Sequence, residues 1–393
     1  MLAGLVTDWY APRNPALRWV GALAGPFFGG RGRSAFAARA NGIPDELVHA
    51  FPLRSLVWRW QVRRLASRGQ PYDAYVQTDA AFARTAARLD LPEHDVFFGY
   101  SYASLEAMEA EKRRGKLKVL DQIDPGPVHF RIVAEEMARH PELTGPPPEF
   151  PTVYYKRNRQ EWKLADVIVV NSEWTREAII AEGTDPAKIE VLPLAYEAAE
   201  GGEVKGQKSE AKPPISDLRP LNVLWLGQVN VPKGIHYLIE AARMLENEKA
   251  RFDVVGAIGI LPGAVASAPN KMTFHGPISR DRAGEWYQQA DIFVLPTLSD
   301  GFAITQLEAM TYGLPVIVTP NCGRVVEDGK TGFIIPPRDP QALAEAILRF
   351  VRNPKLAAEI SPRCIEVSRT FSIEAYANRL VKIIKNRAVQ WKP

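Results

Sequence analysis

The chain has 393 residues, of which 46% are hydrophobic and 24% are charged, and its formal net charge is +4. This balance is ordinary for a globular protein, and the length exceeds what one hydrophobic core usually holds, so we expect two domains. Because Cys322 and Cys364 are the only cysteines and no long apolar run occurs, the composition argues against a disulfide framework and a membrane-spanning segment. The small positive charge does not require a nucleic-acid partner.

The N-terminal residues, MLAGLVTDWYAPR, lack the basic segment of a signal peptide, and we therefore expect a cytoplasmic protein. Residues 2–7 predict a strand. Nucleotide-binding α/β domains usually open with a strand and a Gly-rich turn, so we expect that a first βα unit is missing before this strand, through a late start codon or a real loss. Gly29, Gly30 and Gly32 lie among arginines with no strand leading into them, which favours a surface loop over a phosphate loop.

Residues 53–68 have helical spacing, with Trp58 and Trp60 placed among several arginines. Two interpretations remain open. The helix can pack on the core and leave a basic face in water, or it can make peripheral contact with an anionic membrane, because a basic helix with tryptophans suits such a surface.

From residue 73 onward the predicted helices and strands alternate, which is typical of a parallel sheet covered on both faces. The predicted helices are 73–89, 101–114, one beginning after 126, and 150–164, and the predicted strands are 96–98, 117–120, 166–170 and 189–192. We expect residues 1–199 to form the N-terminal domain. Residues 200–220 are polar and rich in Gly, Lys and Pro, and they are the predicted linker.

A second α/β domain is predicted over residues 221–372. Its predicted strands are 222–226, 252–255, 272–274, 292–295, 316–318 and 333–335, and its predicted helices are 234–245, 281–289, 304–311, 341–351 and 355–368. The remaining residues, 373–393, begin with a helix that we expect to cross back to the N-terminal domain.

The loop from Gly227 to Gly234 joins a predicted strand to a predicted helix. Gly227 lets the backbone approach a ligand, and Lys233 places a cation beside the start of the helix, which together suit a diphosphate. Taken alone, the pattern is also that of an ordinary loop lysine followed by a glycine turn. A second loop contains Gly276 and Ile278, and it could lie against a nucleotide base.

Two carboxylates belong to a strand–turn–helix unit over residues 291–319. Asp300 lies in the turn at the carboxyl end of the strand, and Glu308 lies about one turn into the following helix. Open α/β sheets bind ligands at that end of their strands. Ionised carboxylates accept hydrogen bonds from donors such as hydroxyls, so carboxylates beside a diphosphate site predict that sugar hydroxyls are recognised.

The second domain resembles the donor domain of the retaining GT-B glycosyltransferases of family 4, the large group that includes glycogen synthase-like and sucrose synthase-like enzymes. The family pattern is close to E-G-F-G-x-P-x-L-E-A-M-A-x-G-x-P-V-I, and this chain reads D-G-F-A-I-T-Q-L-E-A-M-T-Y-G-L-P-V-I from Asp300. The resemblance is close over about residues 221–350 and looser over 160–195. It implies the α/β GT-B fold, with two Rossmann-like parallel-sheet domains facing across a cleft, the N-terminal one on the acceptor side.

The resemblance also implies roles for individual residues. Asp300 would contact the donor sugar, Glu308 the nucleotide ribose, and Lys233 the diphosphate. The loop residues that would complete the donor site are Gly227, Gln228, Gly276, Ile278, Gly301, Phe302 and Ala303.

The chain departs from the family pattern at two of these positions. Gln228 stands where the family often has Arg, and Asp300 is one methylene shorter than the usual Glu. No D-x-D sequence follows a strand, so we expect no metal and no cofactor, with phosphate charge met by Lys233, arginines and helix dipoles.

Asp121 and His129 follow a predicted strand of the N-terminal domain. Enzymes of this fold usually place a histidine or an acid there to contact the donor sugar or polarise the acceptor. A turn role for Asp121 and a surface position for His129 remain the alternative.

The sequence therefore predicts a metal-independent hexosyltransferase that moves a sugar from a UDP- or GDP-sugar to a hydroxyl of a glycan, lipid-linked or small-molecule acceptor, with retention. It would serve polysaccharide or glycolipid synthesis in the cytoplasm or at the inner face of the membrane. A nucleotide-sugar epimerase of the same fold and a non-catalytic binding protein are the alternatives.

Overall fold

A computed structural model describes residues 4–7, 43–67, 71–196 and 219–391. The predicted Gly-rich loop at residues 29–32 and nearly all of the predicted linker lie outside these ranges. The chain divides into two compact units. Unit 1 comprises Met1–Asp121, Pro151–Ile168 and Gln390–Pro393, and unit 2 comprises Gln122–Phe150 and Val169–Val389. The predicted domain boundaries and the crossing of the last helix stay predictions.

The first half of the chain contains two small sheets. The strands β1 and β2 pair in parallel, and four further strands form a sheet in the order β3-β4-β5-β6, in which β3 and β4 are parallel. The strands are β1 (Leu5–Thr7), β2 (Val48–Ala50), β3 (Val96–Tyr100), β4 (Leu117–Gln122), β5 (Val167–Val170) and β6 (Ile189–Val191). The pairing of β1 with β2 was not predicted, because a strand of three residues carries too little pattern to be recognised.

The helices of the first half follow the predicted alternation. They are α3 (Pro52–Ala66), α4 (Pro71–Ala87), α5 (Leu105–Arg113), α6 (Pro127–Arg139), α7 (Pro141–Thr144), α8 (Thr152–Leu164) and α9 (Glu173–Ala181). The predicted start of α5 at residue 101 was wrong. The Oγ of Ser104 donates a hydrogen bond of 2.6 Å to the Tyr100 carbonyl, and this bond closes a turn before the helix begins.

The second half forms one six-stranded sheet in the order β12-β11-β10-β7-β8-β9, and all five pairings are parallel. Its strands are β7 (Leu221–Leu226), β8 (Ala250–Val255), β9 (Met272–Gly276), β10 (Ile292–Leu295), β11 (Val316–Val318) and β12 (Gly332–Ile334). The adjacent strands β10 and β11 are continuous apolar runs, and every residue of both is buried. Such runs are typical of strands covered on both faces.

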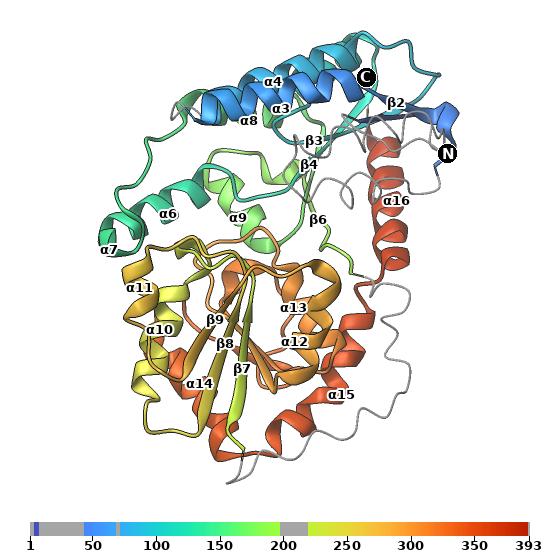
Figure 1. Ribbon diagram of the computed structural model, residues 1–393. Helices are drawn as coiled ribbons and strands as arrows, with labels where there is room; N and C mark the ends of the chain where they lie inside the picture. Colours follow the sequence, from blue (N-terminus) through green and yellow to red (C-terminus); the bar gives the residue numbers. More distant parts are fainter. Residues whose placement is uncertain (1–3, 8–42, 68–70, 197–218, 392–393) are drawn as a thin grey trace. The chain divides into compact units, whose positions relative to one another are not determined.

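Helices cover both faces of this sheet (Figure 1). Helices α10 (Ile235–Met244), α11 (Pro262–Ala266) and α14 (Pro340–Arg352) lie on one side, and α12 (Ala283–Gln289), α13 (Ile304–Thr311) and α15 (Leu356–Arg369) lie on the other. The last helix is α16 (Ile373–Gln390). Apolar side chains spaced along α14 are buried, and the Asp339 carboxylate caps it by accepting the Ala342 amide at 2.8 Å. The predicted α/β class with parallel sheets is therefore confirmed.

Candidate functional site

The candidate site lies at the carboxyl ends of β7 and β10. In the sheet, β8 and β9 follow on one side of β7, and β10 lies on the other side of β7. The loops that follow β7 and β10 therefore diverge, and in open α/β sheets this is the position of the ligand-binding crevice. Lys233 follows β7 and Asp300 follows β10, so both predicted residues lie at this point.

Local hydrogen bonds hold Lys233 in place. It ends a short 3-10 helix, η4 (Val231–Lys233), and the Asn230 side chain caps that helix by accepting the Lys233 amide at 3.2 Å. Gly234 follows with a left-handed φ of 74°. A Cβ at this position would lie 1.9 Å from the Pro296 carbonyl oxygen, so only glycine lets the β7 loop pack against the end of β10.

The ammonium group of Lys233 contacts the carboxylate of Asp300. Both side chains are largely shielded, with 25% and 18% of their surfaces exposed, so water screens the pair only partly. An anion that enters the crevice would compete with Asp300 for the lysine. The Asp300 carboxylate, no longer paired with Lys233, could then accept a hydrogen bond from a hydroxyl group.

Further hydrogen bonds shape the turn that carries Asp300. The Asp300 amide donates to the Asn321 carbonyl at 2.8 Å, and the Asn321 side chain donates to the Leu298 carbonyl at 2.8 Å. The Ala303 amide donates a hydrogen bond to the Cys322 carbonyl, so it already has a partner. In the part of the chain that the structure describes, the amides of Gly301 and Phe302 have no hydrogen-bond partner, and they remain available to an anion.

Residues from the first half of the chain that belong to unit 2 pack on this turn. A Cβ at Gly301 would lie 2.6 Å from the Ile123 carbonyl oxygen and 2.8 Å from the Asn171 amide nitrogen. The Trp174 indole donates a hydrogen bond of 3.1 Å to the Ser299 hydroxyl. The turn is therefore packed on both sides, which fixes the direction of the Asp300 side chain.

His129 lies in the same cluster, in the first turn of α6. The charges of Asp124, Asp300 and Lys233 act on its ring, which bonds to the backbone of Ser299. Burial lowers the pKa of His129 below its ordinary value, although the nearby carboxylates oppose the shift. Its Nδ1 atom is buried without a hydrogen-bond partner. His129 is half-buried as a whole, and its role stays a prediction.

Glu308 lies on α13, about one turn from its start, as predicted. It is 9% exposed, and its Oε2 accepts a hydrogen bond of 2.8 Å from the Tyr287 hydroxyl. Burial and then the charge of Glu308 raise the pKa of Tyr196 to about 12 and raise that of Tyr312 as well. Tyrosines thus border the Glu308 carboxylate, which can accept further hydrogen bonds from hydroxyl groups.

The remaining predicted donor residues lie at neighbouring strand ends. Gly227 follows β7 and Gly276 ends β9, and the Gly256 amide between them donates to the Gly276 carbonyl at 2.9 Å. Gln228 is exposed and accepts a hydrogen bond from the Asn230 side chain. Ile278 packs on the core with part of its surface exposed.

Asp121 belongs to unit 1, where it lies opposite Tyr100 in the pairing of β3 with β4. It is 8% exposed, and burial raises its pKa from 3.8 to about 6. Tyr100 is 61% exposed. A buried carboxyl beside an exposed aromatic ring is suited to bind a hydroxylated molecule.

Sequence reasoning missed the residues that support the site, namely Ile123, Asn171, Trp174, Tyr196, Tyr287 and Tyr312. The segment NSEW after β5 contained two of them, and its place at the carboxyl end of a strand was the one available signal. The tyrosines gave none, because a tyrosine near a strand is usually a core residue.

A crevice that offers one lysine, two separated carboxylates and free amides at a sheet switch point is typical of nucleotide-sugar-binding proteins. Residues 220–353 match the family described as "Glycosyl transferases group 1". This segment of the chain is therefore similar to the glycosyltransferases of that family.

Two curated bacterial relatives named D-inositol 3-phosphate glycosyltransferase are similar in sequence. The protein from Thermomonospora curvata is 24% identical, over 84% of this chain and 82% of its own. The one from Catenulispora acidiphila is 25% identical, over 59% of this chain, and the matched part is 58% of the relative's length. A sucrose synthase from Acidithiobacillus caldus is 40% identical over 114 residues, which are 26% of this chain and 14% of that enzyme.

Solved structures establish the fold. HepE from Anabaena, crystallised with UDP, matches with a TM-score of 0.60 at 17% identity, over 97% of this chain and 99% of HepE. Sucrose-phosphate synthase from Thermosynechococcus elongatus matches with a TM-score of 0.58 at 20% identity, over 82% and 80%. Both likenesses concern architecture and confirm the predicted GT-B fold.

The packing of Gly234 against Pro296 can be tested by substitution. Gly234→Ala should lower the free energy of unfolding by about 2 kcal/mol or more, because it combines a left-handed φ with a backbone clash. Gly263→Ala is the matched control, since a Cβ there meets no atom within 4 Å and its φ is not left-handed. Urea unfolding followed by circular dichroism measures both. Equal stabilities for the two variants would contradict the packing argument.

Proposed function

We propose that the protein transfers a hexosyl group from a uridine diphosphate sugar to a hydroxyl acceptor, with retention of configuration. The observation that carries the proposal is the pairing of Lys233 with Asp300 at the switch point, with the free amides of Gly301 and Phe302 beside it. The match of residues 220–353 to the group 1 family supports the reaction class. HepE has been crystallised with UDP-glucose, so UDP-glucose is the first donor to test.

The proposed chemistry follows from the charges in the crevice. The donor diphosphate binds the Lys233 ammonium and accepts hydrogen bonds from the amides of Gly301 and Phe302. These groups stabilise the negative charge that develops on the leaving phosphate. Asp300, released from the lysine, accepts hydrogen bonds from the sugar, and Glu308 accepts them from the ribose. The leaving phosphate removes the acceptor proton, so the protein's work is positioning and electrostatic stabilisation, and no protein nucleophile takes part.

We also propose catalytic roles for His129 and Asp121. His129 lies near Asp300 and Lys233, and its buried Nδ1 lacks a partner, so a sugar hydroxyl could satisfy it. Asp121, beside the exposed ring of Tyr100, would accept a hydrogen bond from the acceptor. Gly227, Gln228, Gly276 and Ile278 would border the nucleotide.

Removing the lysine tests the donor site. Lys233→Ala should weaken UDP-glucose binding by about 10-fold or more, because a hydrogen bond to a charged group is worth about 1.5–3 kcal/mol. Isothermal titration calorimetry measures the dissociation constant, and the exposed Lys330→Ala is the control. Equal affinity in all three proteins would refute this donor site.

The same preparation separates the alternatives. Conversion of UDP-glucose to another nucleotide sugar without an acceptor would favour an epimerase, and no binding of any nucleotide sugar by the folded protein would favour a non-catalytic role.

The raised pKa of Asp121 predicts a pH dependence. A carboxyl with a pKa of about 6 is mostly protonated at pH 5 and mostly ionised at pH 7, and only the ionised form can accept the acceptor hydroxyl through both oxygens. The kcat/KM for the acceptor should therefore rise between pH 5 and pH 7. Asp121→Asn should be slower and lack this rise, whereas the exposed Asp90→Asn should keep it. An unchanged pH profile in Asp121→Asn would remove Asp121 from the scheme.

We also propose that α3 makes peripheral contact with the anionic inner face of a membrane. Trp58 packs edge-on against Phe82 of α4, with ring centroids 5.9 Å apart, so this tryptophan belongs to the interior. Trp60 is 57% exposed, and the Arg64 guanidinium lies 5.2 Å from the centroid of its ring. Val57, 54% exposed, extends the same face one turn earlier. No helix in the described part of the chain is long and apolar enough to cross a membrane.

Vesicle sedimentation tests this contact. The protein should sediment with phosphatidylglycerol-containing vesicles and not with phosphatidylcholine vesicles, and Trp60→Ala should release it. Val153→Ala, which removes a similarly exposed side chain on α8, is the control. Equal sedimentation with both lipids, or an unaffected Trp60→Ala, would exclude α3 as an anionic-lipid contact.

A further inference from the structure

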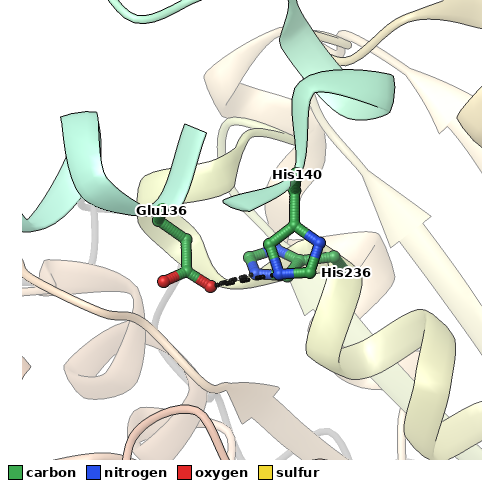
Figure 2. A group of neighbouring side chains, drawn as sticks. All are labelled: Glu136, His140 and His236. Atoms are coloured by element: carbon green, nitrogen blue, oxygen red, sulfur yellow. Dashed lines mark hydrogen bonds and ion pairs between the residues drawn. The ribbon is translucent and has the colours of Figure 1, made fainter. Parts of the chain in front are cut away.

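A cluster of three potential metal ligands lies within unit 2, apart from the residues assigned to the donor (Figure 2). Glu136 and His140 come from α6 and its C-terminal end, and His236 comes from α10. One ligand atom from each residue can be chosen so that all three lie within 4.8 Å of one another. The four-residue spacing of Glu136 and His140 places both on one side of α6, and packing brings His236 to them.

Two of the three ligand–ligand distances suit a tetrahedral transition metal. The Nε2 atoms of His236 and His140 lie 3.0 Å and 3.5 Å from the Oε1 atom of Glu136. Ligand atoms at about 2.0–2.1 Å from a tetrahedral zinc ion are separated by about 3.3 Å, which falls between these two values. Two imidazoles and one carboxylate are also a donor set that zinc accepts, and water can complete it.

The hydrogen bonds around the cluster indicate which atoms face its centre. His140 Nδ1 lies 3.2 Å from the Glu142 carboxylate, an acceptor, so the neutral ring carries its proton on Nδ1. Its Nε2 then presents a lone pair toward the Glu136 oxygen. Two lone pairs facing each other repel, and either a cation between them or a second proton on the ring removes the repulsion.

The Glu136 oxygen is crowded in the same way. Oε1 lies within reach of the Tyr237 hydroxyl and of both imidazole Nε2 atoms, whereas a carboxylate oxygen offers about two lone-pair sites. The other oxygen, Oε2, accepts from Arg338 Nε at 2.8 Å. The two oxygens of this buried carboxylate are thus surrounded by hydrogen-bonding groups of His236, Tyr237 and Arg338.

The surroundings also orient the ligands. Glu142 holds the His140 ring and Arg338 holds the Glu136 carboxylate, and such outer partners are typical of protein metal sites. Glu136 is fully buried and His236 is 4% exposed, whereas the His140 side chain is 26% exposed and leaves a path from solvent. His236 Nδ1 is buried without a hydrogen-bond partner.

We infer that Glu136, His140 and His236 bind a divalent transition metal ion such as Zn²⁺ that ties α6 to α10. Helix α6 begins two residues before His129, and α10 begins two residues after Lys233. The ion therefore joins the two elements that bring His129 and Lys233 into one cluster. Its role is structural, and it does not depend on which reaction the protein catalyses.

The test uses the full-length protein without a histidine tag, stripped of metal and titrated with ZnCl₂. We expect one Zn²⁺ per chain by calorimetry and elemental analysis, and a rise of about 5 °C or more in Tm at a hundredfold excess over Kd. His140→Ala is the main variant, because its partly exposed side chain can be removed with little effect on packing. It should weaken Zn²⁺ binding by at least about 100-fold, since loss of a ligand exceeds the effect of losing an outer partner.

A matched control removes an imidazole from a simple histidine–carboxylate pair. His94→Gln breaks the His94–Glu111 pair, whose Nε2–Oε2 distance is 3.0 Å, and should leave zinc binding unchanged. The visible spectrum of the Co²⁺-loaded protein gives a second measurement, with a tetrahedral signature expected in the wild type and in His94→Gln but not in His140→Ala. Absence of stoichiometric Zn²⁺ binding, or equal binding by His140→Ala, would overturn the inference and leave the cluster as a hydrogen-bonded clamp.

Discussion

The contact between Lys233 and Asp300 joins the two halves of the second sheet. It lies where the strand order reverses, so it links the loop after β7 to the loop after β10. Each partner depends on its own local support, the Asn230 cap and Gly234 for the lysine and the Asn321 backbone for the aspartate. In the absence of donor, the pair keeps two largely shielded charges neutralised. In the proposed reaction a diphosphate sugar would replace that contact with two others, which connects the stability of the empty site to its proposed chemistry.

The segment 122–150 gives the site its second side. Its chain position belongs to the first half, yet it clusters with the second half of the chain. The Ile123 carbonyl packs under Gly301, and His129 lies near Asp300 and Lys233. At the far end of α6, Glu136 bonds to His236 and Arg338. The helix is thus tied at both ends, and a shift of its C-terminal end would also move His129.

Much of this arrangement was predictable from the sequence, for identifiable reasons. The boundaries of β10 and α13 were predicted because an apolar run, a polar turn and a stretch of helix formers follow one another without ambiguity. Lys233 and Asp300 were predicted because both follow strands of a parallel sheet, whose carboxyl ends share one edge. Their direct contact was not predicted, since it depends on β10 lying beside β7 rather than beside β9. The cluster of Glu136, His140 and His236 was not predicted, because His236 lies 100 residues from Glu136 and no local spacing relates them.

The sequence by itself determined the alternation of strands and helices, the parallel α/β class and the position of Glu308 on its helix, because each follows from local propensity and periodicity. Only the tertiary structure decided which charged side chains contact one another. It paired Lys233 with Asp300, brought the half-buried His129 near them, and packed Trp58 against Phe82 while leaving Trp60 exposed. These outcomes depend on the strand order and on contacts between distant segments, and a linear pattern of residues carries neither.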